Sequence, residues 1–422
     1  MDDWLRSAAQ RRPDHPAVVA RGDALTYAQL DAAASRTARR VAALGVGEGD
    51  RVATTLPPGL AFAELLHALP RLGAVLVPLD PRAPLRVHAA LTVDAPLDGF
   101  EADVELRRRI DPDAVHTIIH TSGTTGAAKP VELTYANHHA SATASAENLG
   151  VEPDDSWLSP LPVHHVGGLA VLLRSAIYAT TAVLHERFDA TRVKDALGDA
   201  TLASLVPTML GRLRDAGLER APRLRAALLG GGPIPQDLLD WAAETGLPMC
   251  PTYGMTETAS QIATAPPGRR AAVPLPGAEL RIGDDGEILV RGPMVSRGAL
   301  ARDGWLHTGD RGRIDPAGRL HVEGRLKEMI VTGGENVSPI EVEEALLEHP
   351  AVVDAGVTGA PDPEWGEAVT AFVVVRGRTD AEQLTAWCRE RLGAHKVPKR
   401  IELVDSLPRN AAGKLLRTRL LG

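Results

Sequence analysis

The sequence predicts an α/β protein: a large N-terminal region of stacked βα sheets with a small β-barrel, joined by a hinge to a small α+β C-terminal domain. Strand-like and helix-like segments alternate through roughly the first 275 residues, which is the pattern of parallel βα units. From about residue 276 short strands are separated by turn residues, and a new order of elements starts near residue 328. We therefore expect an N-terminal domain at 1–324 and a C-terminal domain at 328–422, with a short connection at 325–327.

The first helix is predicted over residues 25–45. Thr26 and Gln29 have the spacing of a capping box, and Gly45 can end the helix. The neighbouring segments predict strands at 51–56 and 75–79. Between them, the segment 61–74 is predicted to be helical up to Pro70. This succession favours parallel pairing of the two strands.

The middle of the chain continues the alternation and then changes character. A strand is expected at 114–120 and a helix at 135–150. The segment 202–210 is expected to lead to a helix, and 224–229 to form a strand before a Gly–Pro turn. Three short strands then follow at 277–282, 286–292 and 318–324, separated by turns such as DDG and DPAG. They predict the small antiparallel sheet or barrel.

The C-terminal domain has a clear helix start. Ser338 can cap the helix, Pro339 fits its first turn, and Glu341 has the capping-box position. A strand and turn at 328–334, a strand at 368–377 and a helix at 380–393 complete the expected α+β order.

Composition excludes several classes of function. The 422 residues carry a net charge of −8, whereas a nucleic-acid binder would show a basic face. The basic cluster at 212–225 is interrupted by acids and is interpreted as solvated helix faces. No apolar run approaches the ~20 residues that span a bilayer, and the first residues lack the apolar segment of a signal peptide, so we expect a cytoplasmic protein. Cys250 and Cys388 match no metal-site spacing and are expected to be free thiols.

The segment HTSGTTGAAKP at 120–130 has the composition of a phosphate-binding loop. Its glycines allow backbone amides to surround an anion, its hydroxyls add donors, and its lysine adds a positive charge. The residues expected to contact phosphate are Thr121, Ser122, Gly123, Thr124, Thr125, Gly126 and Lys129. The spacing differs from G-x-x-x-x-G-K-[ST], so this is not the loop of a P-loop NTPase.

Further motifs follow this loop in a fixed order. They are YGMTETAS at 253–260, HTGD at 307–310, GRLKEMI at 324–330 and PRNAAGKLLR at 408–417, with weaker matches in TYAQLD at 26–31 and LVPLDPRAP at 76–84. Together with the loop they resemble the adenylate-forming enzymes, the superfamily of acyl-CoA synthetases, luciferases and adenylation domains. The resemblance covers about residues 8 to 420. Between 84 and 120 the chain is shorter than is usual in the family, so a peripheral strand and helix are expected to be reduced.

The resemblance implies two half-reactions: a carboxylate attacks the α-phosphate of ATP, and a thiol, usually of CoA, then displaces AMP. ATP, Mg²⁺ and CoA are the implied cofactors and co-substrate. Tyr253 would stack on adenine, Thr256 would hydrogen-bond the α-phosphate, and Glu257 would coordinate Mg²⁺. Asp310 would accept the ribose hydroxyls. The remaining nucleotide contacts are expected from Gly230, Gly231, Gly232, Thr252, Gly254, Met255 and Arg325.

The C-terminal motifs imply a moving domain. Lys414 would stabilise the charge that develops between the attacking carboxylate and the α-phosphate. Lys327 occupies the hinge position. After adenylation, rotation of the domain would bring Gly333 and Gly334 to the border of a thiol channel.

The acid is the least determined part of the prediction. His165 is expected to line the acyl site and to act there beside Lys414 and Thr256. The segments around residues 162–178, 204–213 and 228–239 resemble a branch of the family that activates an aromatic keto-dicarboxylic acid. Its second carboxylate would need a partner: Arg174 is a candidate, with a structural salt bridge as its alternative role. Polar contacts would come from Thr208, Ser260 and Gln261.

Other functions stay open at this point. A CoA ligase for another aryl or fatty acid and a stand-alone enzyme that loads a carrier protein share every motif above. A carrier-loading enzyme would usually show an anchoring Asp near 164–168, where this chain has His-His-Val-Gly-Gly. A nucleotide sensor need not keep Lys414, Glu257 and the phosphate loop together. The expected partners are small molecules, with a homodimer possible.

Overall fold

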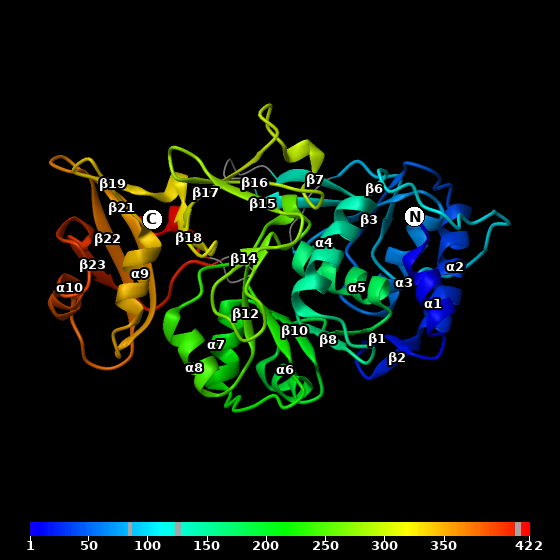
Figure 1. Cartoon of the computed structure of the whole chain (residues 1–422), viewed down its shortest axis with the longest axis horizontal. Helices are drawn as coiled ribbons and strands as arrows, with labels where there is room; N and C mark the ends of the chain where they lie inside the picture. Colours follow the sequence, from blue (N-terminus) through cyan, green and yellow to red (C-terminus); the bar gives the residue numbers. More distant parts are fainter. Residues whose placement is uncertain (83–86, 123–127, 410–414) are drawn as a thin grey trace. The chain divides into compact units, whose positions relative to one another are not determined.

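The computed structural model describes residues 1–82, 87–122, 128–409 and 415–422 (Figure 1). They form two compact units. The first unit consists of Met1–Gly231, Ala242–Glu279 and Val290–Leu306, and the second of Gly232–Trp241, Leu280–Leu289 and His307–Gly422. The division into domains at residues 325–327 stays a prediction.

The largest sheet of the first unit has nine strands in the order β14-β13-β12-β11-β10-β8-β9-β1-β2. Its strands are β1 Pro16–Ala20, β2 Asp23–Thr26, β8 Ser156–Ser159, β9 Thr181–Leu184, β10 Leu202–Leu205, β11 Ala226–Leu229, β12 Met249–Tyr253, β13 Ala263–Thr264 and β14 Val273–Pro274. The run from β12 to β1 is parallel, as the βα alternation predicts, and antiparallel strands continue it on both sides.

A second sheet of this unit has the order β5-β3-β4-β6-β7. Its strands are β3 Arg51–Thr54, β4 Val75–Pro78, β5 Leu91–Val93, β6 Val115–Ser122 and β7 Ala128–Thr134. The first four positions in the order pair in parallel, and β7 runs antiparallel to β6. The predicted strands at 51–56, 75–79 and 114–120 are confirmed, whereas β7 was not predicted.

Helices cover these sheets. They are α1 Trp4–Arg11, α2 Tyr27–Ala43, α3 Leu60–Ala68, α4 Tyr135–Leu149, α5 Val166–Tyr178, α6 Ala190–Leu197 and α7 Pro207–Asp215. The helix α8 Gln236–Glu244 has residues in both units. Figure 1 shows α4 and α5 side by side, and α5 packs on β8, β9, β10 and β1. The capping box of Thr26 and Gln29 is present at α2. Trp157 and the leucines of α5 lie in the core between these layers.

The second unit contains two sheets. The four-stranded sheet has the order β15-β16-β17-β18 and forms the half-barrel, and the other has the order β20-β19-β22-β21 with β23 beside β22. The elements are β15 Glu279–Ile282, β16 Glu287–Arg291, β17 Leu306–Ile314, β18 Leu320–Arg325, β19 Ile330–Thr332, β20 Glu335–Val337, α9 Pro339–Leu347, β21 Val352–Asp362, β22 Gly366–Val375, α10 Ala381–Arg389 and β23 Arg400–Leu403. The α+β order predicted for the C-terminal domain is confirmed.

Two local predictions need correction. Ser338 caps α9 by accepting a hydrogen bond from the Glu341 amide, but the Glu341 carboxylate binds Lys396 Nζ at 2.6 and 2.8 Å instead of closing a capping box. The stretch 212–225 is helical only up to Asp215. Arg225, expected on a solvated helix face, is instead a structural ion-pair partner, because it lies directly before the strand β11 and faces Asp155.

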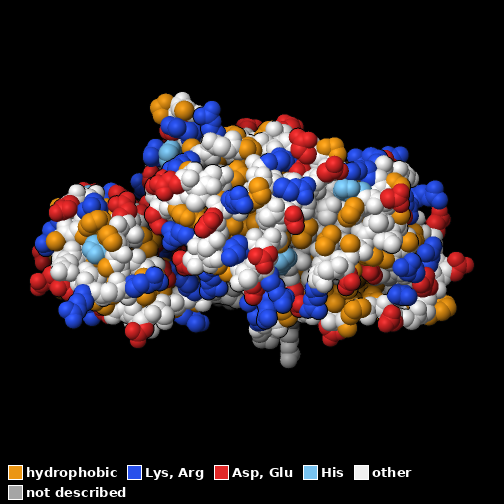
Figure 2. Space-filling model, turned by 90° about the horizontal axis from the view of Figure 1, so that it is seen from below, with side chains coloured by type: hydrophobic (Ala, Val, Ile, Leu, Met, Phe, Trp, Pro, Cys, Tyr) orange, Lys and Arg blue, Asp and Glu red, His pale blue; other side chains and the backbone are white. Residues whose placement is uncertain are grey.

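The surface and the thiols agree with the composition. Basic and acidic side chains are interspersed on the face seen in Figure 2. Cys250 and Cys388 are free and buried, and burial raises the pKa of each thiol to about 11. Among the residues that the structure describes, no helix is long and apolar enough to cross a membrane.

A buried ion pair fixes the amino-terminal edge of the nine-stranded sheet. Asp155, Thr201 and Arg225 precede β8, β10 and β11. Arg225 Nε donates to Asp155 Oδ1 at 2.8 Å, Arg225 Nη2 binds the other oxygen, and Thr201 Oγ1 donates to Oδ1 at 2.7 Å. Burial opposes ionisation of Asp155, but the hydrogen bonds from Arg225 and its neighbours outweigh it and lower the pKa of the carboxyl. The charged carboxylate therefore stabilises the register of three strands.

Arg225→Met should destabilise the protein by about 3 kcal/mol at pH 7, because it leaves a buried carboxylate unpaired. The native pair contributes its stability above the ordinary carboxyl pKa and loses it as the pH falls through the lowered pKa of the folded state. The variant should therefore approach the wild type in stability as the pH falls toward 3. Urea denaturation at pH 7 and pH 3.5 measures this. Arg220→Met, an exposed change in the same loop, should stay within about 0.5 kcal/mol. Equal effects of the two changes would contradict the assignment.

Candidate active site

Four motifs of the sequence meet at one edge of the nine-stranded sheet. The strands β8, β10, β11 and β12 are adjacent and parallel. His165, Thr208 and Gly230 lie in the segments that follow β8, β10 and β11, and Tyr253 is the last residue of β12. Their carboxyl ends lie at the same edge, which is where open α/β sheets bind ligands. The structure thus brings together predicted adenine and acyl residues that are up to 88 positions apart in the chain.

Glycine lets the backbone approach closely at this edge. A Cβ added to Gly230 would lie 2.6 Å from the main-chain oxygen of Thr252, so only glycine fits at this position. Gly231 has φ +82°, which also favours glycine. At Gly232 an added Cβ would meet no atom within 4 Å, so the space beside this residue is open. The loop after β11 therefore exposes main chain beside the end of β12, as a nucleotide contact requires.

The motif after β12 is a rigid turn. The Thr258 hydroxyl accepts a hydrogen bond from the Met255 amide at 3.0 Å and lies 3.1 Å from the main-chain oxygen of Ser260. Ala259 and Ser260 have φ values of +49° and +104°, a conformation that costs free energy in residues with a Cβ. A Cβ on Gly254 would lie 1.7 Å from the Ser260 oxygen. The turn holds one conformation only with glycine at its start.

Glu257 stands in a short 3-10 helix, Thr256–Thr258, with Thr256 beside it. The main-chain oxygen of Glu257 accepts a hydrogen bond from the Ser296 amide at 2.8 Å, and both motif side chains are half-buried. Among the described residues no group of three His, Cys, Asp or Glu side chains could hold a metal. A single carboxylate fits Mg²⁺, which usually completes its shell with water and phosphate oxygens.

The phosphate loop connects the two strands of a β-hairpin. Thr121 of β6 pairs with Lys129 of β7, so the two side chains lie on the same face of the sheet. The helix predicted at 135–150 is confirmed as α4, which begins at Tyr135. The strand β7, which lies between the loop and this helix, was not predicted. The predicted phosphate contacts Gly123, Thr124, Thr125 and Gly126 lie outside the described residues, and Ser122 is placed only by its backbone at the end of β6.

His164 and His165 stand at the start of α5, with ring centroids 4.6 Å apart. His164 Nε2 lies 3.6 Å from Asp80 Oδ2, and Asp80 is held by Arg82 at 2.9 Å. Burial lowers the pKa of His164 to about 4 and also lowers the pKa of His165. Both rings are therefore neutral at pH 7. Sequence reasoning missed Asp80 as a site residue, although it belongs to the weak early motif LVPLDPRAP.

Arg174 is buried on the same helix, with 2% of its surface exposed. Its Nη2 donates to Ser141 Oγ at 3.2 Å, and its guanidinium lies 5.6 Å from the Trp157 ring centroid. Within the described part of the chain, no carboxylate forms an ion pair with it. The Ser141 hydroxyl in turn donates to the main-chain oxygen of Ala259 at 2.8 Å, so Arg174 is connected to the strained turn of the motif.

The other predicted acid contacts differ in their surroundings. Thr208 is exposed in the first turn of α7, and Ser260 is half-buried in the turn. Gln261 is 2% exposed, and neither of its amide atoms has a hydrogen-bond partner among the described residues. A buried amide without a partner is costly. Gln261 therefore has unused hydrogen-bonding capacity beside Ser260.

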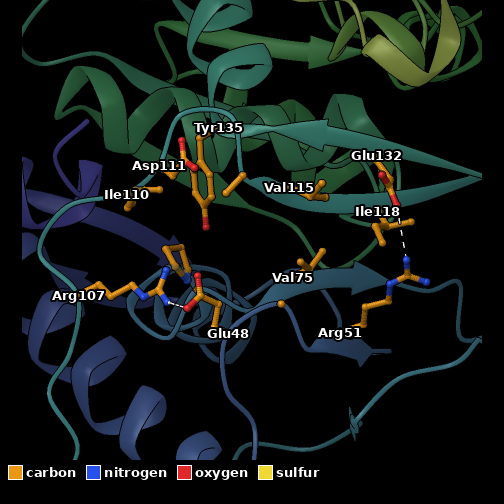
Figure 3. A pocket seen from close by; sticks show the side chains of 14 residues that line it. Glu48, Arg51, Val75, Arg107, Ile110, Asp111, Val115, Ile118, Glu132 and Tyr135 are labelled. Atoms are coloured by element: carbon orange, nitrogen blue, oxygen red, sulfur yellow. Dashed lines mark ion pairs between the residues drawn. The ribbon is translucent and has the colours of Figure 1, made fainter.

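A cavity of about 290 Å³ in the first unit lies away from these residues (Figure 3). Its lining includes Arg51, Val75 and Val115, which begin β3, β4 and β6, and Figure 3 shows the ion pair of Arg51 with Glu132 across it. The Tyr135 hydroxyl points into it. The cavity reaches Ile118 of β6, which is four residues, or about 13 Å along the strand, before the end of β6 at Ser122. None of the residues predicted to bind the nucleotide or the acid is among those that line this cavity.

In the second unit the half-barrel brings two predicted residues together. Asp310 of β17 and Arg325 of β18 are register partners, and Arg325 Nε lies 2.8 Å from Asp310 Oδ1. Asp310 is buried, and its amide donates to Thr308 Oγ1 at 3.1 Å. Arg325 Nη1 donates to the Thr308 main-chain oxygen at 3.3 Å. The arginine thus orients the carboxylate that the family resemblance assigns to ribose.

The hinge and channel residues lie at the start of the next sheet. Lys327 is exposed in a 3-10 helix, Leu326–Glu328. Gly333 and Gly334 form the two-residue turn between β19 and β20, with φ values of +60° and +84°. Such a turn needs two residues with positive φ, which explains the glycine pair. Lys414 lies outside the described residues.

Comparison with known proteins agrees with this arrangement. The AMP-binding enzyme family model matches residues 5–97 and 86–300, and the model of the AMP-binding enzyme C-terminal domain matches residues 341–414. The two ranges matched by the first family model overlap at residues 86–97, in the region where the chain is shorter than expected.

Curated relatives match over the whole chain. A protein of Bacillus licheniformis named 2-succinylbenzoate–CoA ligase is 39% identical, with 99% of each chain covered, and one of the same name from Geobacillus kaustophilus is 41% identical, covering 100% of this chain and 97% of the relative. Both are long enough to share every motif described above.

Solved structures give the same picture. The o-succinylbenzoate CoA synthetase (MenE) of Bacillus subtilis in complex with its acyl-adenylate intermediate has a TM-score of 0.92 at 36% identity, covering 100% of this chain and 98% of that one. The same enzyme with ATP and magnesium ion has a TM-score of 0.91, and both chains are covered completely. The motifs, the fold and the full-length matches agree, and the chain belongs to the AMP-binding enzyme family.

Proposed function

We propose that the chain is an ATP-dependent acid–CoA ligase that converts o-succinylbenzoate to o-succinylbenzoyl-CoA, a step of menaquinone biosynthesis. The observation that carries the proposal is the meeting of acid and nucleotide motifs at the carboxyl edge of β8, β10, β11 and β12. Full-length relatives at 39% and 41% identity are named for this acid and for CoA. A relative in complex with its acyl-adenylate supports the two-step reaction.

The first step forms a mixed anhydride. A carboxylate oxygen of the acid attacks the α-phosphorus of ATP, the bond from that phosphorus to the bridging oxygen of the β-phosphate breaks, and pyrophosphate leaves. The phosphate hairpin, with Thr121 and Lys129, is proposed to hold the departing β- and γ-phosphates. Glu257 would hold Mg²⁺, which supplies positive charge to the phosphate oxygens. Thr256 would bond the α-phosphate, and Lys414 would stabilise the charge that builds up there.

The second step releases AMP. The CoA sulfur attacks the acyl carbon after losing its proton, the bond to the AMP oxygen breaks, and AMP leaves with that electron pair as its phosphate anion. The small domain is proposed to rotate about Lys327 between the steps, so that the Gly333–Gly334 turn replaces Lys414 at the acyl group. Asp310, oriented by Arg325, keeps hold of the ribose in both steps.

The acid site needs few charged groups near the carboxylate that reacts. It also needs a hydrogen-bonding or charged partner for the second carboxylate of the substrate. His165 is neutral at pH 7, so it can pack against the acyl group without placing a positive charge beside the reacting carboxylate. Arg174 is a buried cation without a carboxylate partner in the described part of the chain, and we assign it to the spectator carboxylate. Thr208, Ser260 and Gln261 are proposed to supply polar contacts, with the unused amide of Gln261 as the strongest candidate.

One assay tests the function. Purified protein with ATP, Mg²⁺ and CoA should release pyrophosphate and form thioester with o-succinylbenzoate, and should turn over benzoate or a fatty acid at least about 100-fold less efficiently. Good thioester formation from a monoacid alone would replace the proposed substrate with another aryl or fatty acid. Pyrophosphate without thioester would point to a carrier-protein acceptor.

Lys414→Ala should separate the two half-reactions. Adenylation should fall by about 100-fold or more, since the lysine charge acts only in that transition state. Conversion of supplied acyl-AMP and CoA to thioester should be retained. Rapid-quench measurement of each step with the purified variant checks this. If both steps decline equally, the proposed alternation of the domain is wrong.

Arg174→Met should raise the KM for o-succinylbenzoate about 10- to 100-fold, the value of a hydrogen-bonded charge. The KM for ATP should not change, and residual turnover of a monoacid should be unaffected. Ser141→Ala is the matched control, because it removes the Arg174 hydrogen bond without removing the charge. A similar loss with every acid in both variants would assign Arg174 to supporting the turn at Ala259 instead.

A further inference from the structure

The segment that carries Lys414 leaves and rejoins the second unit at one closed base. Arg409 and Leu415, on either side of residues 410–414, form an antiparallel bridge. The Leu416 amide donates to the main-chain oxygen of Pro408 at 2.8 Å. The two arms of the segment are therefore held together where they meet the domain.

Arg417 anchors the second arm through three elements. Its Nε donates to Glu328 Oε2 at 2.8 Å, just after the predicted hinge. Its Nη1 and Nη2 bind both carboxylate oxygens of Glu343 on α9, the second at 2.9 Å. Nη1 also donates to the Val357 main-chain oxygen of β21 at 3.3 Å. Only 11% of the arginine side chain is exposed, so these contacts are shielded from water.

Glu343 is an unusual partner because it is itself buried in α9. The Val357 amide donates to its Oε1 at 2.7 Å. Burial raises the pKa of this carboxyl, and Arg417 opposes that rise. Replacing a buried ion pair with uncharged groups of similar shape is often neutral for stability. The free energy of folding alone therefore does not explain why Arg417 and Glu343 form a buried ion pair.

The first arm has its own, weaker anchor. Arg409 Nη2 donates to Asp354 Oδ1 on β21 at 2.6 Å, and about 30% of each side chain is exposed. Leu415 packs on the backbone of β21, where a Cβ added to Gly356 would lie 3.2 Å from its Cδ2. Residues on both sides of the segment 410–414 are thus fixed to β21. The more deeply buried contacts are those of Arg417.

We propose that Arg417 is a positioning residue for adenylation: by joining the arm after Lys414 to α9 and to the residue after the hinge, it limits where the lysine can reach. This inference rests on the proposed function. Lys414 is three residues from Arg417, so their Cα atoms lie within about 11 Å whatever the loop conformation. Fixing one end of so short a connection restricts the volume open to the ammonium group. A misplacement of about 1 Å can cost about 100-fold in rate.

The test uses the full-length enzyme with two changes. Arg417→Lys keeps the charge but loses the forked contact with Glu343. The double variant Arg417→Gln with Glu343→Gln removes both charges and leaves no unpaired buried carboxylate. Both should lower the single-turnover rate of adenylation about 10- to 100-fold, with little change in the KM for ATP and acid. Thioester formation from supplied acyl-AMP and CoA should stay within about twofold of the wild type.

A control and a stability measurement separate positioning from structure. Arg391→Gln removes an ion pair of the same unit, with Glu348 at 3.6 Å, and should leave both steps unchanged. Thermal melting of each variant shows whether the domain stays folded, and the double variant is chosen to melt near the wild type.

Two results would overturn the inference, and a third would instead show that the proposed function fails. Equal losses in both half-reactions, with lowered melting temperature, would make Arg417 a structural residue. Unchanged adenylation in both variants would show that the anchor is not needed, even where Lys414→Ala still blocks that step. Adenylation that also survives Lys414→Ala would instead overturn the proposed role of the lysine.

Discussion

Parallel pairing of β8, β10, β11 and β12 is the constraint on which the site depends. In parallel strands, every loop that follows a strand lies at the same edge of the sheet. Residues from four motifs that are far apart in the sequence therefore lie along one edge. The opposite edge has the opposite character. Asp155, Thr201 and Arg225 pair there and fix the register of the strands. A slip by one residue would turn every side chain to the other face, so this pairing protects the site at the far end.

Near the proposed acid site, the two sheets of the first unit meet where a neutral histidine lies beside a charged aspartate that is already paired. Asp80 follows β4 of the smaller sheet, and His164 follows β8 of the larger one, at 3.6 Å. Arg82 satisfies the charge of Asp80, and its hydrogen bond lowers the pKa of that carboxyl to about 2. The histidines stay neutral because burial lowers their pKa values, which outweighs the opposing effect of Asp80. In the proposed reaction, an acid substrate would therefore meet neither an extra cation nor an unpaired carboxylate beside its reacting group.

What the sequence could predict follows from the distance over which each signal acts. The capping box of Thr26 and Gln29 spans three residues and is present, and the βα alternation is likewise local. The strand β7 was missed because Pro130 and charged residues interrupt its apolar pattern. Asp80 and His164 are 84 positions apart, and their contact depends on how two sheets pack. The pairing of Asp310 with Arg325 needs the register of a hairpin, which the motifs alone do not contain.

Polar groups are used differently at supporting and reacting places in this molecule. Asp155 and Glu343 are buried and fully engaged by arginines, which suits parts that must hold one geometry. At the carboxyl edge, Gln261 has two amide atoms without partners among the described residues, and Arg174 has no carboxylate. Buried polar groups are normally satisfied, so those left with capacity mark where binding can compensate their cost. We propose that an acid bound at this edge satisfies these groups, which would favour a dicarboxylate over a monoacid.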